Sequence, residues 1–205
     1  HMRPEMLGAQ LIDELINRHS ILQVDGLFCG NAVGTGGNIG RLMGLMCNLP
    51  NSVPAITVDM QCASALMSIE IAYAHIVSGI MDSAIAGGIE SSSLQPERVY
   101  ASGDDRKGTY KVAQFTPQDQ SPLAMLEGAE RTIHKHNVTK EDLYPHIIGS
   151  HQRASAALDN PYLQSYIMPI TIDGKRCIDE CIRPTMNEKL LSRMKPLLGA
   201  DSITN

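Results

Sequence analysis

The stretch AITVDMQCASALMSIEIAYAHIVSG, residues 55–79, decides the fold because it changes from strand-like to helix-like sequence within a few residues. Residues 55–60 are apolar and β-branched without a helical period, which predicts a buried strand. Beyond the turn, apolar residues fall at helical spacing and predict an amphipathic helix that ends at Gly79. These apolar residues are Leu66, Ile69, Tyr73 and Ile76. Cys62 lies at the turn between the strand and the helix.

The position of Cys62 favours a reactive thiol. At the first turn of a helix it would meet unpaired backbone N–H groups and the positive end of the helix dipole. This environment favours the thiolate, which is the form that acts as a nucleophile. Position alone leaves a second interpretation open, because a cysteine among apolar residues is commonly a packed core residue.

Segments on both sides of this stretch continue the alternation of helix and strand. Before it, the pattern predicts a helix over 6–19, a strand over 24–33 and a helix over 39–48; after it, a strand over 82–93. The alternation predicts a layered α/β fold. From residue 96 to about 120 the chain is polar and rich in turn residues. The pattern then predicts helices over 124–136, 139–158 and 187–198, with a strand over 166–173.

Composition excludes several classes of protein. The net charge of −5 gives no overall attraction to nucleic acid, and no apolar run approaches the roughly 20 residues that span a bilayer. Five cysteines scattered along 205 residues indicate reduced thiols and a cytoplasmic protein. Cys177 and Cys181 have no second ligand pair nearby, so we expect no metal site. The glycines of residues 34–40 lack dinucleotide spacing, so we expect no nucleotide loop.

The motifs around Cys62 resemble those of the thiolase family. Residues 55–79 followed by SAIAGGIESSS, 83–93, resemble the thiolase pattern of a Val-Asn/Asp-x-x-Cys-x-Ser turn, a helix, and a strand ending Gly-Gly-Met-Glu-Ser. GNAVGTGGNIGR, 30–41, is similar to the family's glycine-rich segment. AMLEGAE, 124–130, and SHQRASAA, 150–157, look like segments of its loop domain. The resemblance covers about residues 4–204.

The resemblance implies a thiolase-like layered α-β-α half-domain with an inserted, mostly helical loop domain, incomplete at both ends. The expected organisation is an N-terminal thiolase core over 1–94, an inserted CoA-binding loop domain over 95–194, and a return toward the core over 195–205. The resemblance also implies a role in lipid metabolism, with acyl-CoA as substrate and no covalently bound cofactor. It further implies a homo-oligomer, either a dimer or a tetramer.

The resemblance also assigns roles to residues. It implies that Cys62 takes the acyl group from CoA in an acyl-CoA C-acyltransferase. It further implies that Met125 lines the pantetheine side of the tunnel, and that Gly87, Gly88 and Glu90 shape the wall behind the nucleophile. A basic cluster at residues 106–111 is either a CoA-phosphate contact or a solvated loop.

The chain departs from the family pattern at single positions and in whole motifs. Ala65, Ile89 and Ala124 replace a glycine, a methionine and a histidine of the family. The Asn-Glu-Ala-Phe, Gly-His-Pro and Cys-x-Gly-Gly-Gly motifs, which carry the distal histidine and the second cysteine, are absent from the sequence. We therefore expect a fragment, a split-gene product or a damaged copy, inactive alone. The alternatives are a non-catalytic CoA-ester or partner-binding protein and a subunit completed in trans.

Overall fold

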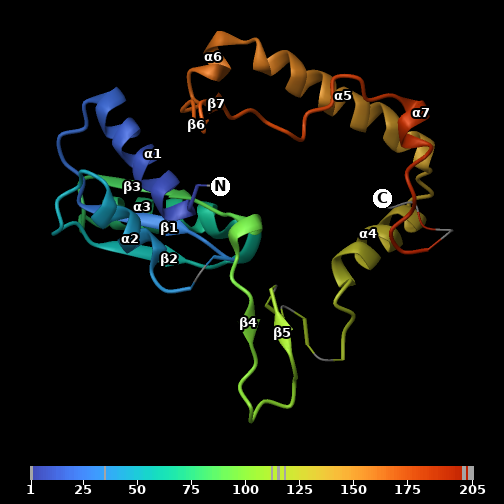
Figure 1. The fold of residues 1–205 in the computed structure, drawn as a ribbon, viewed down its shortest axis with the longest axis horizontal. Coiled ribbons are helices and arrows are strands. Elements are labelled where there is room, and N and C mark those ends of the chain that lie inside the picture. Colours follow the sequence, from blue (N-terminus) through green and yellow to red (C-terminus); the bar gives the residue numbers. More distant parts are fainter. Residues whose placement is uncertain are drawn as a thin grey trace. The chain divides into compact units, whose positions relative to one another are not determined.

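The computed structural model describes residues 2–34, 36–111, 113–114, 116–117, 119–199 and 202. The chain divides into two compact units, His1–Ala113 and Gln114–Asn205, drawn from blue to green and from yellow to red in Figure 1. The predicted inserted domain over 95–194 stays a prediction. Part of the predicted return segment, 195–205, lies outside the described residues.

The first unit is built on a three-stranded parallel sheet with strand order β2-β1-β3. Its strands are β1 (Gly26–Gly30), β2 (Ala55–Val58) and β3 (Ala84–Gly88). Every residue of β1 is buried, because it is the central strand and hydrogen-bonds to both neighbours. The parallel sheet and its helices confirm the α/β prediction. All three strands fall within the segments predicted from the sequence.

Helices cover both faces of this sheet (Figure 1). On one face, α1 (Pro4–His19) and α2 (Ile39–Met46) pack against each other, and the buried cluster they form includes Leu27 and Cys29 of β1. On the other face lies α3 (Ser64–Val77), where the ring of Phe28 lies 5.3 Å from that of His75, centroid to centroid. Successive residues of a strand point to opposite faces, so β1 serves both helix layers.

The helix that follows Cys62 presents an unexpected face to the sheet. Its buried residues are small: Ser64, Ser68 and Ala72. The apolar residues at helical spacing are between 41% and 67% exposed: Leu66, Ile69, Tyr73 and Ile76. The cause is the close approach of α3, since a Cβ atom at Gly30 would lie 2.5 Å from the backbone nitrogen of Ala65. The apolar spacing therefore identified the helix but not its sheet-facing side.

A hairpin completes the first unit. After η1 (Gln61–Ala63) and η2 (Ser92–Leu94), the antiparallel strands β4 (Arg98–Val99) and β5 (Thr109–Tyr110) fall within the polar segment that was predicted to be rich in turns. The guanidinium of Arg98 donates to the carbonyl of Gly34 at 2.5 Å. This bond ties the hairpin to the loop that follows β1.

The second unit is mainly helical. Its elements are α4 (Ala124–Lys135), α5 (Lys140–Leu158), α6 (Pro161–Gln164), β6 (Thr171–Ile172), β7 (Lys175–Arg176) and α7 (Glu188–Leu191). Thr139 and Asp142 form a capping box at the start of α5, which agrees with the helix predicted over 139–158. The strand predicted over 166–173 was too long, because only its last part pairs, with β7. The helix predicted over 187–198 is likewise shorter.

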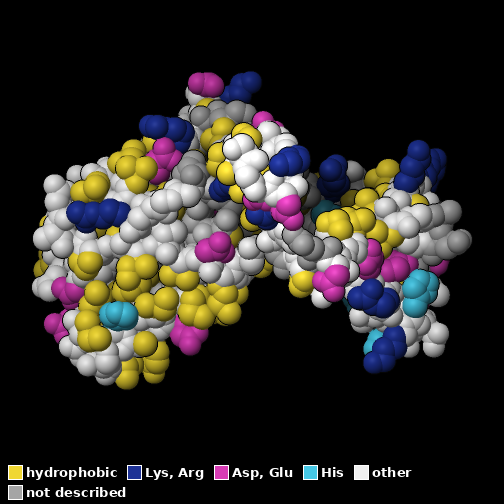
Figure 2. Space-filling view, turned by 90° about the horizontal axis from the view of Figure 1, so that it is seen from below, with side chains coloured by type: hydrophobic (Ala, Val, Ile, Leu, Met, Phe, Trp, Pro, Cys, Tyr) yellow, Lys and Arg dark blue, Asp and Glu magenta, His cyan; other side chains and the backbone are white. Residues whose placement is uncertain are grey.

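Within the described residues, no helix is both long enough and apolar enough to cross a membrane. Hydrophobic side chains nevertheless reach the surface in groups between charged side chains, as Figure 2 shows for one face of the molecule. Twenty-seven large hydrophobic residues are exposed on the described chain, including those on the outer face of α3. Contiguous apolar patches of this kind are typical of surfaces that bind another protein or a ligand.

Candidate active site

Cys62 lies in a cleft at the carboxyl ends of the parallel strands. The cleft has a volume of about 360 Å³, and the Cys62 residue is exposed. Three segments line it at the strand ends: Gly30–Val33 from the end of β1, four residues after β2 (Gln61, Cys62, Ser64 and Ala65), and Gly88–Glu90 from the end of β3. The carboxyl ends of parallel strands are where open α/β sheets bind ligands. The structure thus brings Cys62, Gly88 and Glu90 together.

Glu90 fixes one wall of this cleft. One carboxylate oxygen accepts the backbone N–H groups of Ala32 and Val33, each at 2.8 Å. The other accepts the side-chain amide of Asn31 at 3.1 Å and the N–H of Ser91 at 3.3 Å. The loop after β1 is therefore held in place by a residue from β3's end. That Glu90 shapes the wall behind a nucleophile stays a prediction. Its contacts indicate how it would do so, by fixing the loop after β1.

The turn that carries Cys62 is held by side chains within a few residues of it. The hydroxyl of Ser64 accepts the N–H of Met60 at 2.8 Å and donates to the carbonyl of Gln61 at 2.6 Å. A carboxylate oxygen of Asp59 accepts the N–H of Gln61 at 3.0 Å. Gln61 has φ of 52°, in the left-handed region that non-glycine residues rarely adopt. The residue directly before the thiol is thus held in an unfavourable conformation.

The five cysteines, all free thiols, differ sharply in environment. Burial raises the pKa of Cys29 to about 11, and burial also raises the pKa of Cys47. Cys62, Cys177 and Cys181 are exposed. Of these, Cys62 lies in η1, two residues before the first residue of α3, and the N-cap residue Ala63 makes no side-chain hydrogen bond to the first turn of that helix. An anionic sulfur would suit this helix end.

Proton transfer is the part of the chemistry that this cleft does not supply. Among the described residues lining it, Glu90 is the one ionisable side chain besides Cys62. Its carboxylate already accepts four hydrogen bonds, three of them from the cleft-lining residues Asn31, Ala32 and Val33. The cleft can therefore present a nucleophile, but its described residues offer no free general base.

Two other predicted binding residues are placed differently. Gly87 lies in β3, one residue before the cleft-lining Gly88, and its carbonyl accepts the hydroxyl of Ser68 at 2.8 Å. Met125 lies on α4 in the second unit, where it is 74% exposed. Its predicted place on the pantetheine side of a tunnel stays a prediction.

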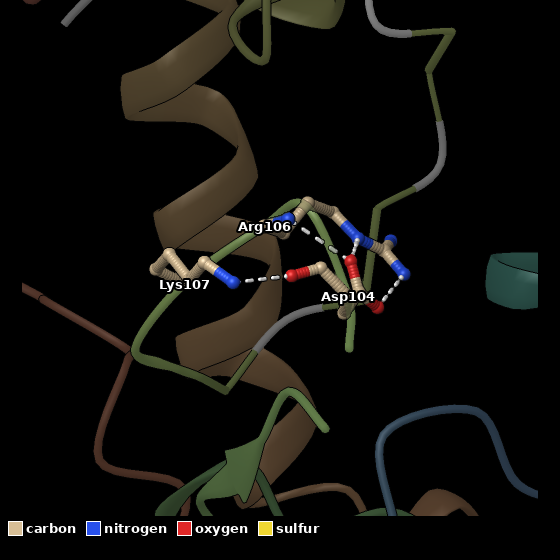
Figure 3. A network of polar contacts seen from close by, with 3 residues as sticks. All are labelled: Asp104, Arg106 and Lys107. Atoms are coloured by element: carbon tan, nitrogen blue, oxygen red, sulfur yellow. Dashed lines mark hydrogen bonds and ion pairs between the residues drawn. The ribbon is translucent and has the colours of Figure 1, made fainter. Parts of the chain in front are cut away.

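The basic cluster near residue 106 forms a local network rather than a set of free charges (Figure 3). Asp104 accepts two bonds from the guanidinium of Arg106, at 2.9 and 2.8 Å, while Lys107 donates to its carbonyl at 2.7 Å. The Arg106 guanidinium holds the pKa of Asp104 well below its usual range. Arg106 also lies 4.4 Å over the ring of Tyr100. These contacts favour the solvated-loop interpretation over a phosphate contact.

The other candidate ligand groups gain no support. Among the described histidines, cysteines, aspartates and glutamates, no group of three or more could hold a metal ion. His134 pairs with Glu130 at 3.1 Å, and the ring of His151 accepts the N–H of Arg183 at 3.3 Å. These contacts are local and do not form a second site.

Sequence reasoning missed three residues of the site: Asn31, Asp59 and Ser64. Asn31 bonds both Glu90 and the carbonyl of Ile89, the latter at 2.8 Å, so it links two strand ends. Asp59 and Ser64 stand in the Val-Asp-x-x-Cys-x-Ser pattern that gave the resemblance. The motif was therefore a signal for both of them, but it did not reveal their hydrogen bonds.

A parallel α/β sheet that presents an exposed thiol before a helix fits the class of proteins that use a cysteine nucleophile. The chain matches the family model described as thiolase, N-terminal domain, over residues 1–202. It therefore belongs to the thiolase family, which confirms the resemblance.

Its curated relatives carry an acetyltransferase name. The protein "Putative acetyl-CoA C-acetyltransferase VraB" of Staphylococcus epidermidis is 32% identical over 214 residues, covering 100% of this chain and 55% of the relative. The protein of the same name from Staphylococcus aureus is 30% identical over 211 residues, with the same coverage of 100% and 55%. The chain thus spans about half the length of the curated relatives it matches.

Proposed function

We propose that this chain carries the nucleophile of an acyl-CoA C-acyltransferase, and that the nucleophile is Cys62. The supporting observation is the exposed Cys62 thiol in a cleft at the start of α3, in a chain of the thiolase family. The relatives' name points to acetyl-CoA as the first substrate to test.

The proposed step is transfer of the acyl group from one sulfur to another. The Cys62 thiolate attacks the thioester carbonyl, a new carbon–sulfur bond forms to Cys62, and the bond to the CoA sulfur breaks. CoA leaves as its thiolate and takes a proton from solvent. The positive end of the α3 dipole would stabilise the charge that develops on the carbonyl oxygen.

Four further residues belong to this proposal as substrate contacts. Gly87, Gly88 and Glu90 form the wall behind the nucleophile, and Met125 lines the pantetheine side. Neither a metal nor a covalently bound cofactor is required, because the thioester already activates its carbonyl.

The test is acyl transfer in a single half-reaction, which needs the nucleophile but not the second substrate. The chain is incubated with acetyl-CoA, and intact-mass measurement with peptide mapping locates any acetyl group. We expect one acetyl group on Cys62, lost in Cys62→Ser and kept when Cys177→Ser and Cys181→Ser are combined. Acetylation spread evenly over the three exposed thiols, or none on a folded chain, would overturn the assignment.

Complete turnover is a separate matter. We expect negligible thiolysis of acetoacetyl-CoA by this chain alone, because the described cleft lacks the histidine and second cysteine that thiolases use for proton transfer. A rate comparable to that of a complete thiolase would show that another residue acts as the base.

One observation favours a second candidate function. The Glu90 carboxylate already accepts four hydrogen bonds, so no described side chain of the cleft is free to act as a general base for Cys62. Without such a base the cleft could bind a CoA ester and leave its acyl group in place. This alternative is a non-catalytic CoA-ester or partner-binding protein, or a subunit completed in trans. Titration calorimetry with acetyl-CoA separates the two: binding without acetylation of Cys62 supports the alternative.

Several properties implied by thiolase membership belong to the same proposal. They are the inserted loop domain over 95–194, assembly into a dimer or tetramer, a role in lipid metabolism and a cytoplasmic location. Sedimentation of the purified chain at several concentrations tests the assembly, and a strictly monomeric species would contradict it.

A further inference from the structure

The turn before α3 contains a conformation that needs support. Gln61 has φ of 52° and is not a glycine, so its left-handed backbone is unfavourable unless other contacts hold it. Gln61 directly precedes Cys62. The backbone angles of one residue set the direction of the next residue's side chain, so a change at Gln61 would re-aim the thiol.

The side chain of Ser64 bridges this turn from both sides. Its hydroxyl accepts the N–H of Met60 at 2.8 Å and donates to the carbonyl of Gln61 at 2.6 Å. These two backbone groups belong to Met60 and Gln61, which are joined by one peptide bond. One side chain therefore satisfies both and closes the turn around the left-handed residue.

Ser64 is itself fixed by the sheet. It is 6% exposed, and a Cβ atom at Gly30 would lie 2.5 Å from the carbonyl carbon of Ser64. The start of α3 thus has little room to move relative to β1. The hydroxyl transmits this fixed position to the turn, and Asp59 adds a second contact at the N–H of Gln61, at 3.0 Å.

We propose that Ser64 is a positioning residue for the Cys62 nucleophile: its hydroxyl holds Gln61 in the left-handed conformation that aims the thiol into the cleft. Asp59 acts with it from the other side of the turn. This inference rests on the proposed function, in which Cys62 is the nucleophile. Both bonds of the Ser64 hydroxyl go to the backbone of the turn, so we expect its effect to appear through the thiol.

The test measures the thiols against one another in the same molecule. Ser64→Ala and the native chain are treated with limiting iodoacetamide, and peptide mapping gives the rate for each cysteine. We expect Cys62 in Ser64→Ala to react about tenfold more slowly relative to Cys177 and Cys181. Ser64→Thr, which keeps a hydroxyl, should restore the rate. A Cys62 rate within about twofold of the native chain would overturn the proposal.

Two controls separate positioning from unfolding. Cys29 is buried, so its continued protection reports that β1 and its neighbours are intact. Ser78→Ala removes a similar hydroxyl-to-carbonyl bond, 3.1 Å to His75, at the far end of α3 and should leave the Cys62 rate unchanged.

If Cys29 becomes reactive in Ser64→Ala, that variant is unfolded around β1, and the Cys62 rate is measured in Asp59→Ala instead. Asp59 is exposed, and its side chain holds only the N–H of Gln61 in this turn. The expected loss at Cys62 is then about threefold, with Cys29 protected. An unchanged rate in Asp59→Ala would overturn the proposal in that case.

Alkylation does not involve CoA, so this test is independent of the proposed acyl transfer. If acetyl-CoA fails to label Cys62 while Ser64→Ala still slows its alkylation, the acyltransferase proposal fails and the positioning of the thiol stands.

Discussion

The two faces of the β2-β1-β3 sheet are packed by different rules. Toward α1 and α2 the strands present larger apolar residues such as Leu27 and Ile85, which join a cluster of buried side chains. Toward α3 the same two strands end in Gly30 and Gly88, and the helix meets them with Ser64, Ser68 and Ala72. The α1–α2 face is filled by large side chains, whereas on the α3 face Phe28 fills the space beside His75 and the backbone of α3 closely approaches the strands at Gly30 and Gly88.

This difference has a functional side, because Cys62 belongs to the close-packed face. A helix that approaches a sheet closely has few ways to shift, so its first turn is held rigidly. Glycines and serines, which contribute little apolar burial, therefore hold the backbone beside the Cys62 thiol in place. Substitutions on the two faces should therefore differ in their cost to stability.

The largest effect is expected at Gly30. A Cβ atom there would lie 2.5 Å from backbone atoms of both Ser64 and Ala65, which cannot rotate away. Gly30→Ala should lower the free energy of unfolding by about 3 kcal/mol, measured by urea denaturation followed by circular dichroism. Gly87→Ala is the matched control, because no atom lies within 4 Å of its added Cβ, and it should change stability by less than about 1 kcal/mol. Equal effects at both sites would refute the contrast.

The next effect is expected at Ser68, which is 0% exposed and donates to the carbonyls of Ala65 and Gly87 at 2.7 and 2.8 Å. Ser68→Leu should cost about 2 kcal/mol, because it overfills the helix–sheet contact and removes the bond to β3. Ser68→Ala isolates the hydrogen-bond contribution at about 1 kcal/mol. If Ser68→Leu were neutral, α3 could move away from the sheet and the packing would not be tight.

A smaller effect, seen only at alkaline pH, is expected on the opposite face. Burial raises the pKa of Cys29 from its ordinary 9.0 to about 11, so the folded chain keeps this proton where the unfolded chain loses it. Its contribution is therefore constant below pH of about 9 and is lost as the pH rises toward about 11, by on the order of 1 kcal/mol. Comparing pH titrations of stability for the native chain and Cys29→Ala isolates the contribution. Parallel curves would show that Cys29 is less buried in solution.

The smallest effect is expected on the outer side of α3. Leu66 is 67% exposed, so Leu66→Ser should change the stability of this chain by less than about 0.5 kcal/mol. The measurement is repeated over a range of protein concentrations. A larger cost that grows with concentration would show that a second copy covers this face, which agrees with the predicted oligomer.

The sequence predicted the elements of the first unit well because their signals are local. Residues 55–60 and Gly79 bounded the strand and helix around Cys62, and the strand predicted over 24–33 contains β1. The face of α3 could not be predicted in this way. Which side of a helix meets a sheet depends on Gly30 and Gly88, which lie far away in the sequence.

The same limit applies to the candidate site. Cys62 and Glu90 were identified through motifs, but the three hydrogen bonds that the Glu90 carboxylate accepts from the loop after β1 become evident only once β1 and β3 lie side by side. In the second unit, the strand predicted over 166–173 was too long because apolar residues there pair with only the short β7. The β-propensity of a segment identifies residues with an extended backbone, whereas a strand forms only where a neighbouring strand pairs with it.

The bonds of Glu90 also imply an order of assembly during synthesis. Its contacts to Asn31, Ala32 and Val33 span 57 to 59 residues, whereas those at the Cys62 turn span two to four. Short-range contacts close first, because less chain entropy is lost in forming them. As the chain leaves the ribosome, we expect the thiol-bearing turn to form before residue 90 can reach the loop after β1. The Cys62 turn is then in place before Glu90 fixes the opposite wall of the cleft.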